Sequence, residues 1–446
     1  MSIPRFSAIA TLLACAGATM ASIPNYDGLE VQVRSGADSG FNIPAFYSIS
    51  NSQPVINSNG DVSLRVFSPG AMSVWFGNAQ NGGIVYQTAD TEAIIGNVDL
   101  NDAGLIVWAE TFGNNAPGVW QYSPVNGASY RTNRPLGTSA WTALEIDNDA
   151  NIALRASFSG AYAYASVDPA NQVTFYAESS GIDPGSPWDF LFTPAFNNSQ
   201  QIGAKLQLVS GGNEIRVFNA DGTSTLIAQD SSADPTSPYS SFRNSGDLTD
   251  DGRFVFATSL VSGGAGVFVS DGSTTVEIAT TATEPDLDSI EFFAPRINNN
   301  GVVTFRGFDG DGDRSVYVGD GTSLVKIATE GTQLETDLGT LTIGRLDGSP
   351  AFGSSPDIND AGEVVFAASV NDGATDIGTA ITVATVSDEP VCPPDVTGDN
   401  EVDLADLNLV LANFGQTTAD GDTNADGEVD LADLNAVLAV FGTGCD

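Results

Sequence analysis

The side chains with the clearest chemical potential are the oxygen-bearing residues between Asp422 and Asp433. They occupy positions 1, 3, 5, 9 and 12 of a 12-residue loop, with Gly427 at position 6. Calcium prefers oxygen ligands at this spacing, and the glycine permits the sharp turn between them. We therefore predict a calcium site. Its direct ligands would be Asp422, Asn424, Asp426 and Asp433, while Glu428 would offer its backbone carbonyl and Asp430 would act through water.

A second copy of this loop lies 27 residues upstream. Residues 395–415 and 422–442 are identical at 15 of 21 aligned positions. The predicted ligands of the first loop are Asp395, Thr397, Asp399, Glu401, Asp403 and Asp406. We expect two calcium ions, with the first loop weaker, because Thr397 replaces the asparagine and Asn400 replaces the glycine. Each loop carries five acidic side chains that repel one another without a cation, so folding and calcium binding should be coupled.

An amphipathic helix is predicted after each loop. The apolar residues expected on one face of each helix are Leu404, Leu407, Val410, Leu411 and Phe414, and Leu431, Leu434, Val437, Leu438 and Phe441. The two faces would pack into a small all-α module over residues 395–446. So small a module needs additional stabilisation, which calcium and a Cys392–Cys445 disulfide would supply. The alternative is that Cys445 is a free thiol, or is linked to a lipid or a partner.

A different pattern fills residues 26–386, with residues 387–394 as a linker to the module. A hydrophobic residue, Asn or Asp, two small or polar residues and Gly recur before a β-rich run, as in Ile297–Phe305 and Ile358–Phe366. The units start near residues 56, 100, 146, 196, 248, 297 and 358. Asn-x-x-Gly is a turn sequence, because Asn bonds to its own backbone and Gly accepts a positive φ.

Seven units of about 50 residues with roughly four strands each predict an all-β, seven-bladed β-propeller-like domain. A β-solenoid or two stacked β-sandwiches are the alternatives. The last unit lacks a final strand, and a matching strand lies at residues 29–36. We expect that strand to complete the last blade and to hide two sheet edges.

Composition limits the functions open to the chain. It has 446 residues, 15 basic and 56 acidic, with a net charge of −41 and no histidine. Catalytic triads that need histidine are therefore excluded, and binding to nucleic acid is unfavourable. The apolar run from Phe6 to Ala18 after Arg5 predicts a secretory signal peptide over residues 1–21. We therefore expect a secreted protein without a transmembrane segment, either free or attached to the cell surface. Lipid attachment at Cys15 is the alternative.

No catalytic residues can be assigned in the repeat region. Carboxylate pairs could serve a polysaccharide hydrolase or lyase, but with so many acids any single pair is weak evidence. The dense acidic loop Asp309–Asp313 resembles a chelating loop, although a hairpin turn is favoured. Trp108 and Trp120 lie in apolar strand patterns that indicate core positions.

The paired loops and helices at the C-terminus resemble a type I dockerin, most closely the variant that ends in Gly-Cys, here Gly444-Cys445. The resemblance covers about 55 residues and implies calcium-dependent docking to a cohesin-like or cell-surface protein. Partner choice in that family would fall on Leu404, Ala405, Leu431 and Ala432, which are apolar here rather than the common Ser-Thr type. The repeat region resembles secreted bacterial tandem-repeat proteins, a resemblance that implies no reaction.

We therefore favour an exported, non-catalytic binding protein held in a complex or at a surface by its calcium module. The first alternative is a carbohydrate-active enzyme of polysaccharide breakdown on the propeller face. The second alternative is a structural surface or matrix protein.

Overall fold

The structure is a computed structural model that describes residues 20–36, 43–49, 52–89, 91–111, 118–133, 138–387, 394–397, 401–418, 421–424 and 427–444. The chain divides into two compact units. One holds Gly28–Thr385 with the residues before Pro24, and the other holds Pro24–Asp27 with Val386–Asp446. Within the described part of the chain, no helix is both long and apolar enough to span a membrane.

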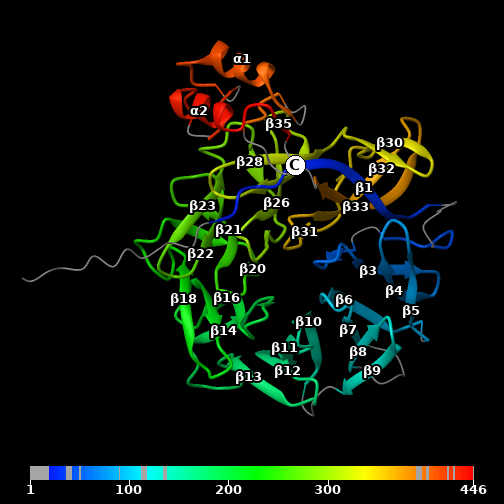
Figure 1. Cartoon of the computed structure of the whole chain (residues 1–446). Helices are drawn as coiled ribbons and strands as arrows, with labels where there is room; N and C mark the ends of the chain where they lie inside the picture. The colour runs from blue at the N-terminus through cyan, green and yellow to red at the C-terminus, as the bar shows by residue number, and fades with distance from the viewer. Residues whose placement is uncertain are drawn as a thin grey trace, which may run out of the picture. The chain divides into compact units, whose positions relative to one another are not determined.

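The first unit consists of seven antiparallel sheets, or blades, that follow one another in chain order (Figure 1). Blade 1 contains β2 (Val55–Ile56), β3 (Val62–Ser68), β4 (Ala71–Gly77) and β5 (Gly82–Gln87). Blade 2 contains β6 (Ile94–Leu100), β7 (Ile106–Thr111), β8 (Gly118–Ser123) and β9 (Gly127–Asn133). Blade 3 contains β10 (Ala140–Ile146), β11 (Ile152–Phe158), β12 (Ala161–Val167) and β13 (Val173–Glu178).

In blades 4 to 6 the first strand position is shared by two short strands. Blade 4 contains β14 (Trp188–Leu191), β15 (Ala195–Phe196), β16 (Ile202–Leu208), β17 (Asn213–Phe218) and β18 (Ser224–Gln229). Blade 5 contains β19 (Tyr239–Phe242), β20 (Asp247–Leu248), β21 (Phe254–Leu260), β22 (Ala265–Ser270) and β23 (Thr275–Thr280). Blade 6 contains β24 (Ser289–Ile290), β25 (Arg296–Ile297), β26 (Val303–Phe308), β27 (Arg314–Gly319) and β28 (Leu324–Thr329).

Blade 7 joins the two ends of the first unit. It contains β29 (Gln333–Thr336), β30 (Gly339–Ile343), β31 (Asp357–Ile358), β32 (Val364–Asn371) and β33 (Asp376–Val386). Its outer strand is β1 (Tyr26–Arg34), which pairs with β33. Past the end of β1, the backbone N–H of Ser35 donates to the carbonyl of Thr379 at 2.9 Å. The seven-bladed architecture and the closure of the last blade by the N-terminal strand are thus both confirmed.

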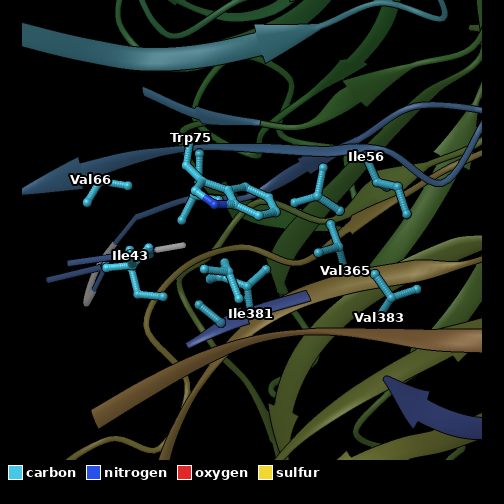
Figure 2. Close-up of a cluster of buried hydrophobic side chains, with 12 residues drawn as sticks. Ile43, Ile56, Val66, Trp75, Val365, Ile381 and Val383 are labelled. Atoms are coloured by element: carbon cyan, nitrogen blue, oxygen red, sulfur yellow. The ribbon is translucent and has the colours of Figure 1, made fainter. Parts of the chain in front are cut away.

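Hydrophobic side chains fill the space between blades. At the closure, Val33 of β1 belongs to a buried cluster that joins blade 7 to blade 1. Figure 2 shows Trp75 and Ile56 of blade 1 facing Val365, Ile381 and Val383 of blade 7. The ring is therefore closed by apolar packing between blades as well as by strand pairing within blade 7.

The second unit contains α1 (Leu404–Asn413) and α2 (Leu431–Ala439), together with the short pair β34 (Glu401–Val402) and β35 (Thr443–Gly444). Each helix begins with a capping box, in which Asp403 or Asp430 is the N-cap and Asp406 or Asp433 reaches back to it. The two predicted helices are present, but each begins at position 10 of its loop rather than after the loop, and the unit is not purely helical.

Candidate functional site

The propeller axis carries a cluster of charged side chains. In four blades the residue directly before the hydrophobic anchor of the repeat is acidic; these residues are Asp99, Glu145, Asp247 and Asp357. In blade 6 the equivalent residue is Arg296. One oxygen of each carboxylate accepts the backbone N–H of the next blade's inner strand, as Asp99 Oδ2 does from Ile146 at 2.7 Å. The other three bonds of this kind are Phe196 N to Glu145 Oε2 (2.6 Å), Ile297 N to Asp247 Oδ2 (3.1 Å) and Ile56 N to Asp357 Oδ2 (3.1 Å).

Arg296 lies among these carboxylates without a close hydrogen bond to any of them. Its Nη1 is 3.8 Å from Glu145 Oε1 and 3.5 Å from Asp247 Oδ1. Its buried Nε donates no hydrogen bond within the described structure, and Asp357 Oδ1 is 4.0 Å away. At this spacing the groups attract one another but leave room for water or a ligand atom between them.

Burial dominates the protonation of the cluster. It raises the pKa of Asp99 to about 7, although the N–H of Ile146 opposes the shift. It also raises the pKa of Asp357 to about 6 despite Arg296, and it holds the pKa of Glu145 well above its ordinary value. The same four carboxylates outweigh the burial of Arg296 and raise its pKa. Part of the axial charge is therefore neutralised by protons near neutral pH.

The Asn-x-x-Gly turns do more than reverse the chain. As predicted, the side chain of Asn101 closes its own turn, because Oδ1 accepts from the backbone of Ala103 and Leu105. Its Nδ2 also donates to the carbonyl of Asp147 in the next blade at 3.1 Å. Equivalent bonds link Asn57 to Asn101 (3.2 Å), Asn197 to Thr249 (2.8 Å), Asn298 to Asn359 (2.9 Å) and Asn359 back to Asn57 (2.9 Å).

A second circle of bonds surrounds the first one. These bonds involve the residue that directly follows the first residue of each turn. Its backbone N–H donates to the side chain of the equivalent residue in the following blade, at 2.8 to 3.0 Å. The residues in this circle are Ser58, Asp102, Asn148, Asn198, Asp250, Asn299 and Asp360. The polar side chains at this end of the axis, which we call the turn face, are thus largely occupied in holding the blades together.

Two cavities lie on the axis, and Asp99, Glu145 and Arg296 line both of them. The cavity on the turn face has a volume of about 180 Å³ and is lined by the residues of the two circles. The other cavity has a volume of about 240 Å³ and lies where the chain enters the inner strands, an end that we call the entry face. Its lining includes residues from all seven blades, among them Gln53, Asn97, Ala143, Thr193, Ser245, Phe292 and Ser355.

The amino-acid sequence carries a signal for this axial cluster that the sequence analysis did not identify. The residue before the unit's hydrophobic anchor is charged in five of seven units, as Asp99, Glu145, Asp247, Arg296 and Asp357. In contrast, the acidic loop at Asp309 forms the favoured turn, since Asp309 Oδ1 accepts from the backbone of Asp311 and Asp313. Trp108 is fully buried, as predicted for a core position, whereas Trp120 is half-buried and packs edge-on against Tyr130.

In the second unit the two predicted loops are arranged alike. The carboxylates of Asp406 and Asp433, at position 12, are both fully buried. Asp433 Oδ2 accepts from Asp430 N at 2.7 Å, and Oδ1 accepts from Thr423 N at 2.8 Å. Asp406 accepts from Asp403 N at 2.8 Å and from Thr397 N, at position 3, at 2.9 Å, and the position-3 bond in the second loop, from Asn424 N to Asp433 Oδ1, is 3.3 Å. Burial alone would raise the pKa of each carboxyl, but these hydrogen bonds outweigh it and lower the pKa of both.

The remaining predicted ligands are only partly brought together. Asp403 and Asp430 serve as helix N-caps, while Asp395, Glu401, Asp422, Asn424 and Glu428 lie along the loops with polar contacts of their own. Asp399 and Asp426 lie outside the described residues, as do Cys392, Cys445 and residues 1–19 of the predicted signal peptide. Among the residues that are described, no three acidic or cysteine side chains are spaced to share a metal ion.

The predicted helix faces are only partly buried. Val410 and Val437 form the core with Val402 and Val429, and Leu407 and Leu434 pack against it. The other predicted core residues, Leu404, Leu411, Phe414, Leu431, Leu438 and Phe441, are exposed instead. Two short helices cannot cover so wide an apolar stripe, so half of it faces outward. Of the predicted partner-contact residues, Leu404 and Leu431 are each 60% exposed, and Ala405 and Ala432 are exposed beside them.

Comparison with known proteins supports the fold of the first unit. No protein-family model matches the sequence, and no curated protein matches it. The β-propeller domain of the Trilobed protease from Pyrococcus furiosus is similar in structure, with a TM-score of 0.50 at 13% identity over 75% of this chain and 94% of that one.

Two further propeller structures are more distant. TolB from Acinetobacter baumannii has a TM-score of 0.39 at 14% identity, over 66% of this chain and 62% of that one. Virginiamycin B lyase from Staphylococcus aureus has a TM-score of 0.42 at 10% identity, over 80% of this chain and 100% of that one. At such identities the likeness to the Pyrococcus domain shows the fold alone, an all-β propeller.

Proposed function

We propose that this chain is an exported, non-catalytic binding protein whose C-terminal unit is a dockerin-like, calcium-dependent docking module. The observation that carries the proposal is the matched geometry of the two loops in that unit. Val402 and Val429, both at position 8, are fully buried, and so are the position-12 carboxylates of both loops. The N–H of Gly442 donates to Val402 O and that of Gly415 donates to Val429 O, both at 2.7 Å. Each loop is therefore braced by the segment that follows the other loop's helix.

The donor set suits calcium, because every predicted ligand offers oxygen. Asp422, Asn424, Asp426 and Asp433 would hold the ion in the second loop, and Asp395, Thr397, Asp399 and Asp406 would hold it in the first. Calcium would offset the repulsion among five acidic side chains in each loop. Asp406 and Asp433 also accept backbone N–H groups of their own loops, which would orient these carboxylates for the ion.

The exposed apolar residues of the two helices supply the docking surface. Leu404 and Leu431 begin the two helices at equivalent positions and are equally exposed. Large apolar side chains exposed in a regular arrangement are typical of protein interaction surfaces. The partner would be a cohesin-like or cell-surface protein.

The test is calcium titration of the full mature chain by calorimetry. We expect two sites in the wild type and loss of the tighter one in Asp422→Ala. Asp221→Ala, which removes an exposed propeller carboxylate, is the control and should leave both sites. Undiminished two-site binding in Asp422→Ala would refute the ligand assignment.

Docking is tested separately with a panel of purified cohesin domains, with calcium and with EGTA. Calcium-dependent capture that disappears in the double variant Leu404→Asp, Leu431→Asp, while calcium uptake persists, is the expected result. If every cohesin fails to bind the calcium-loaded chain, the docking role is wrong.

A further inference from the structure

The two ends of the propeller axis differ in how their polar side chains are used. On the turn face, five asparagine side chains donate hydrogen bonds to backbone carbonyls of neighbouring blades. They are Asn57, Asn101, Asn197, Asn298 and Asn359. On the entry face, five polar side chains that line the cavity make no hydrogen bond to any residue the structure describes. These side chains are Gln53, Asn97, Thr193, Ser245 and Ser355, from blades 1, 2, 4, 5 and 7.

Unused polar groups of this kind are unusual when they are buried. Ser355 is only 7% exposed, yet its hydroxyl has no partner within the described structure. A buried polar group without a hydrogen bond costs about 1–3 kcal/mol, so native proteins rarely keep one without a bound water or ligand. Ser355 is the buried member of the five, while Gln53, Thr193 and Ser245 are half-buried and Asn97 is exposed, so the cavity offers one buried and four accessible hydrogen-bonding side chains to a polar molecule.

The floor of the cavity offers both kinds of hydrogen-bonding group. Asp99 and Glu145 supply acceptors, and Arg296 supplies donors, including the unpartnered Nε. Carboxyls and a guanidinium stand together on this floor, so neither sign of ligand charge is favoured there. A ligand that donates and accepts hydrogen bonds without a charge of its own fits this arrangement better than an anion or a cation.

An aromatic side chain stands at the rim. Phe292 is 82% exposed, and the guanidinium carbon of Arg243 lies 3.6 Å from its ring centroid. The cation fixes one face of the ring and leaves the opposite face open to a ligand. Ala143, also in the lining, has φ of 54° at a β-bulge between Thr142 and Glu145, a strained conformation of the kind found at functional sites.

We propose that the entry-face cavity binds a neutral polyhydroxylated ligand, one sugar ring in size, which stacks on Phe292 and hydrogen-bonds to the unpaired side chains and the axial floor. The volume of about 240 Å³ admits one such ring. This inference deepens the proposed binding role by naming the ligand class of the propeller. It does not depend on the calcium module.

The experiment is saturation-transfer NMR on the full mature chain with methyl glycosides of glucose, galactose, mannose and xylose, and with myo-inositol. At least one probe should bind, and EGTA should not change its affinity. Phe292→Ala should weaken binding about tenfold through the lost stacking contact. Phe46→Ala is the matched control, because Phe46 is 86% exposed but does not line the cavity.

Thr193→Val tests the hydrogen-bonding role at constant side-chain volume and should also weaken binding severalfold. The proposal is overturned if no probe binds, if glucosamine or glucuronate binds more tightly than every neutral probe, or if Phe292→Ala behaves like Phe46→Ala. Since the readout is unaffected by EGTA, failure here is distinguishable from failure of calcium-dependent docking.

Discussion

The guanidinium of Arg34 and the carboxylate of Asp337 form a bidentate ion pair, although the two residues are 303 positions apart in the sequence. Arg34 Nε and Nη2 lie 2.9 Å from Asp337 Oδ1 and Oδ2, and the Arg34 side chain is fully buried. Arg34 ends the N-terminal strand, and Asp337 lies at the tip of the β29–β30 hairpin. The pair therefore fastens the closing strand to the last blade.

Removing one partner of this pair should be costly, since it leaves a buried charge uncompensated. Asp337→Ala should lower the free energy of unfolding of the propeller by about 3 kcal/mol, measured by urea denaturation. Asp347→Ala breaks an exposed ion pair with Arg345 and should cost less than about 1 kcal/mol. Equal losses in the two variants would contradict the role of the Arg34–Asp337 pair.

The hydrogen-bonded circle on the turn face should be equally sensitive. Asn101→Ala removes the bonds within its own turn and the bond to Asp147, and it should cost about 2 kcal/mol of stability in the same measurement. Asn126→Ala, at an exposed position with no described side-chain bond, is the control and should change stability by less than about 0.5 kcal/mol. A loss at Asn101 no larger than that at Asn126 would show that the circle is dispensable.

The axial carboxyls predict a dependence of stability on pH. Asp99 and Asp357 titrate at about 7 and about 6 in the folded chain but near 4 when unfolded, so the folded state binds more protons between pH 4 and 7. Their contribution is present below about pH 4 and is lost as the pH rises to about 7. Asp99→Asn should flatten this fall by about 4 kcal/mol in denaturation curves at several pH values. A slope unchanged from the wild type would mean that Asp99 is ionised throughout.

The apolar residues of the two helices in the second unit are partly buried and partly exposed. Substitutions of neighbouring apolar residues should therefore differ in their effect on stability. Val410→Ala opens a hole in a core of four valines and should destabilise that unit by about 2 kcal/mol, seen as earlier loss of helical circular dichroism. Leu411→Ala removes an exposed side chain and should cost less than about 0.5 kcal/mol. If Leu411→Ala is the more damaging change, Leu411 belongs to the core after all.

The repeated sequence pattern around Asn101 and Asn298 predicted the blade architecture, because turns and strands are specified by residues close together in the chain and this pattern recurs in every unit. The closing strand could also be predicted, since the last unit visibly lacks one. The axial cluster was missed because the type of residue at this place in the repeat differs between units, for example Val55 in the first and Arg296 in the sixth. Only the closure of the ring in three dimensions brings these residues together. The exposure of Leu411 was missed because helical periodicity defines an apolar face but not how much of it a partner covers.

The pairing of β1 with β33 also bears on the order of folding. Roughly 350 residues separate the two strands, a far longer separation than that of the hairpin contacts inside the other blades. Contacts between distant residues form more slowly than local hairpins, because a long loop must close first. A chain that has not yet closed its ring therefore exposes the unpaired edges of two strands, which are the part of the molecule most prone to pair with another chain.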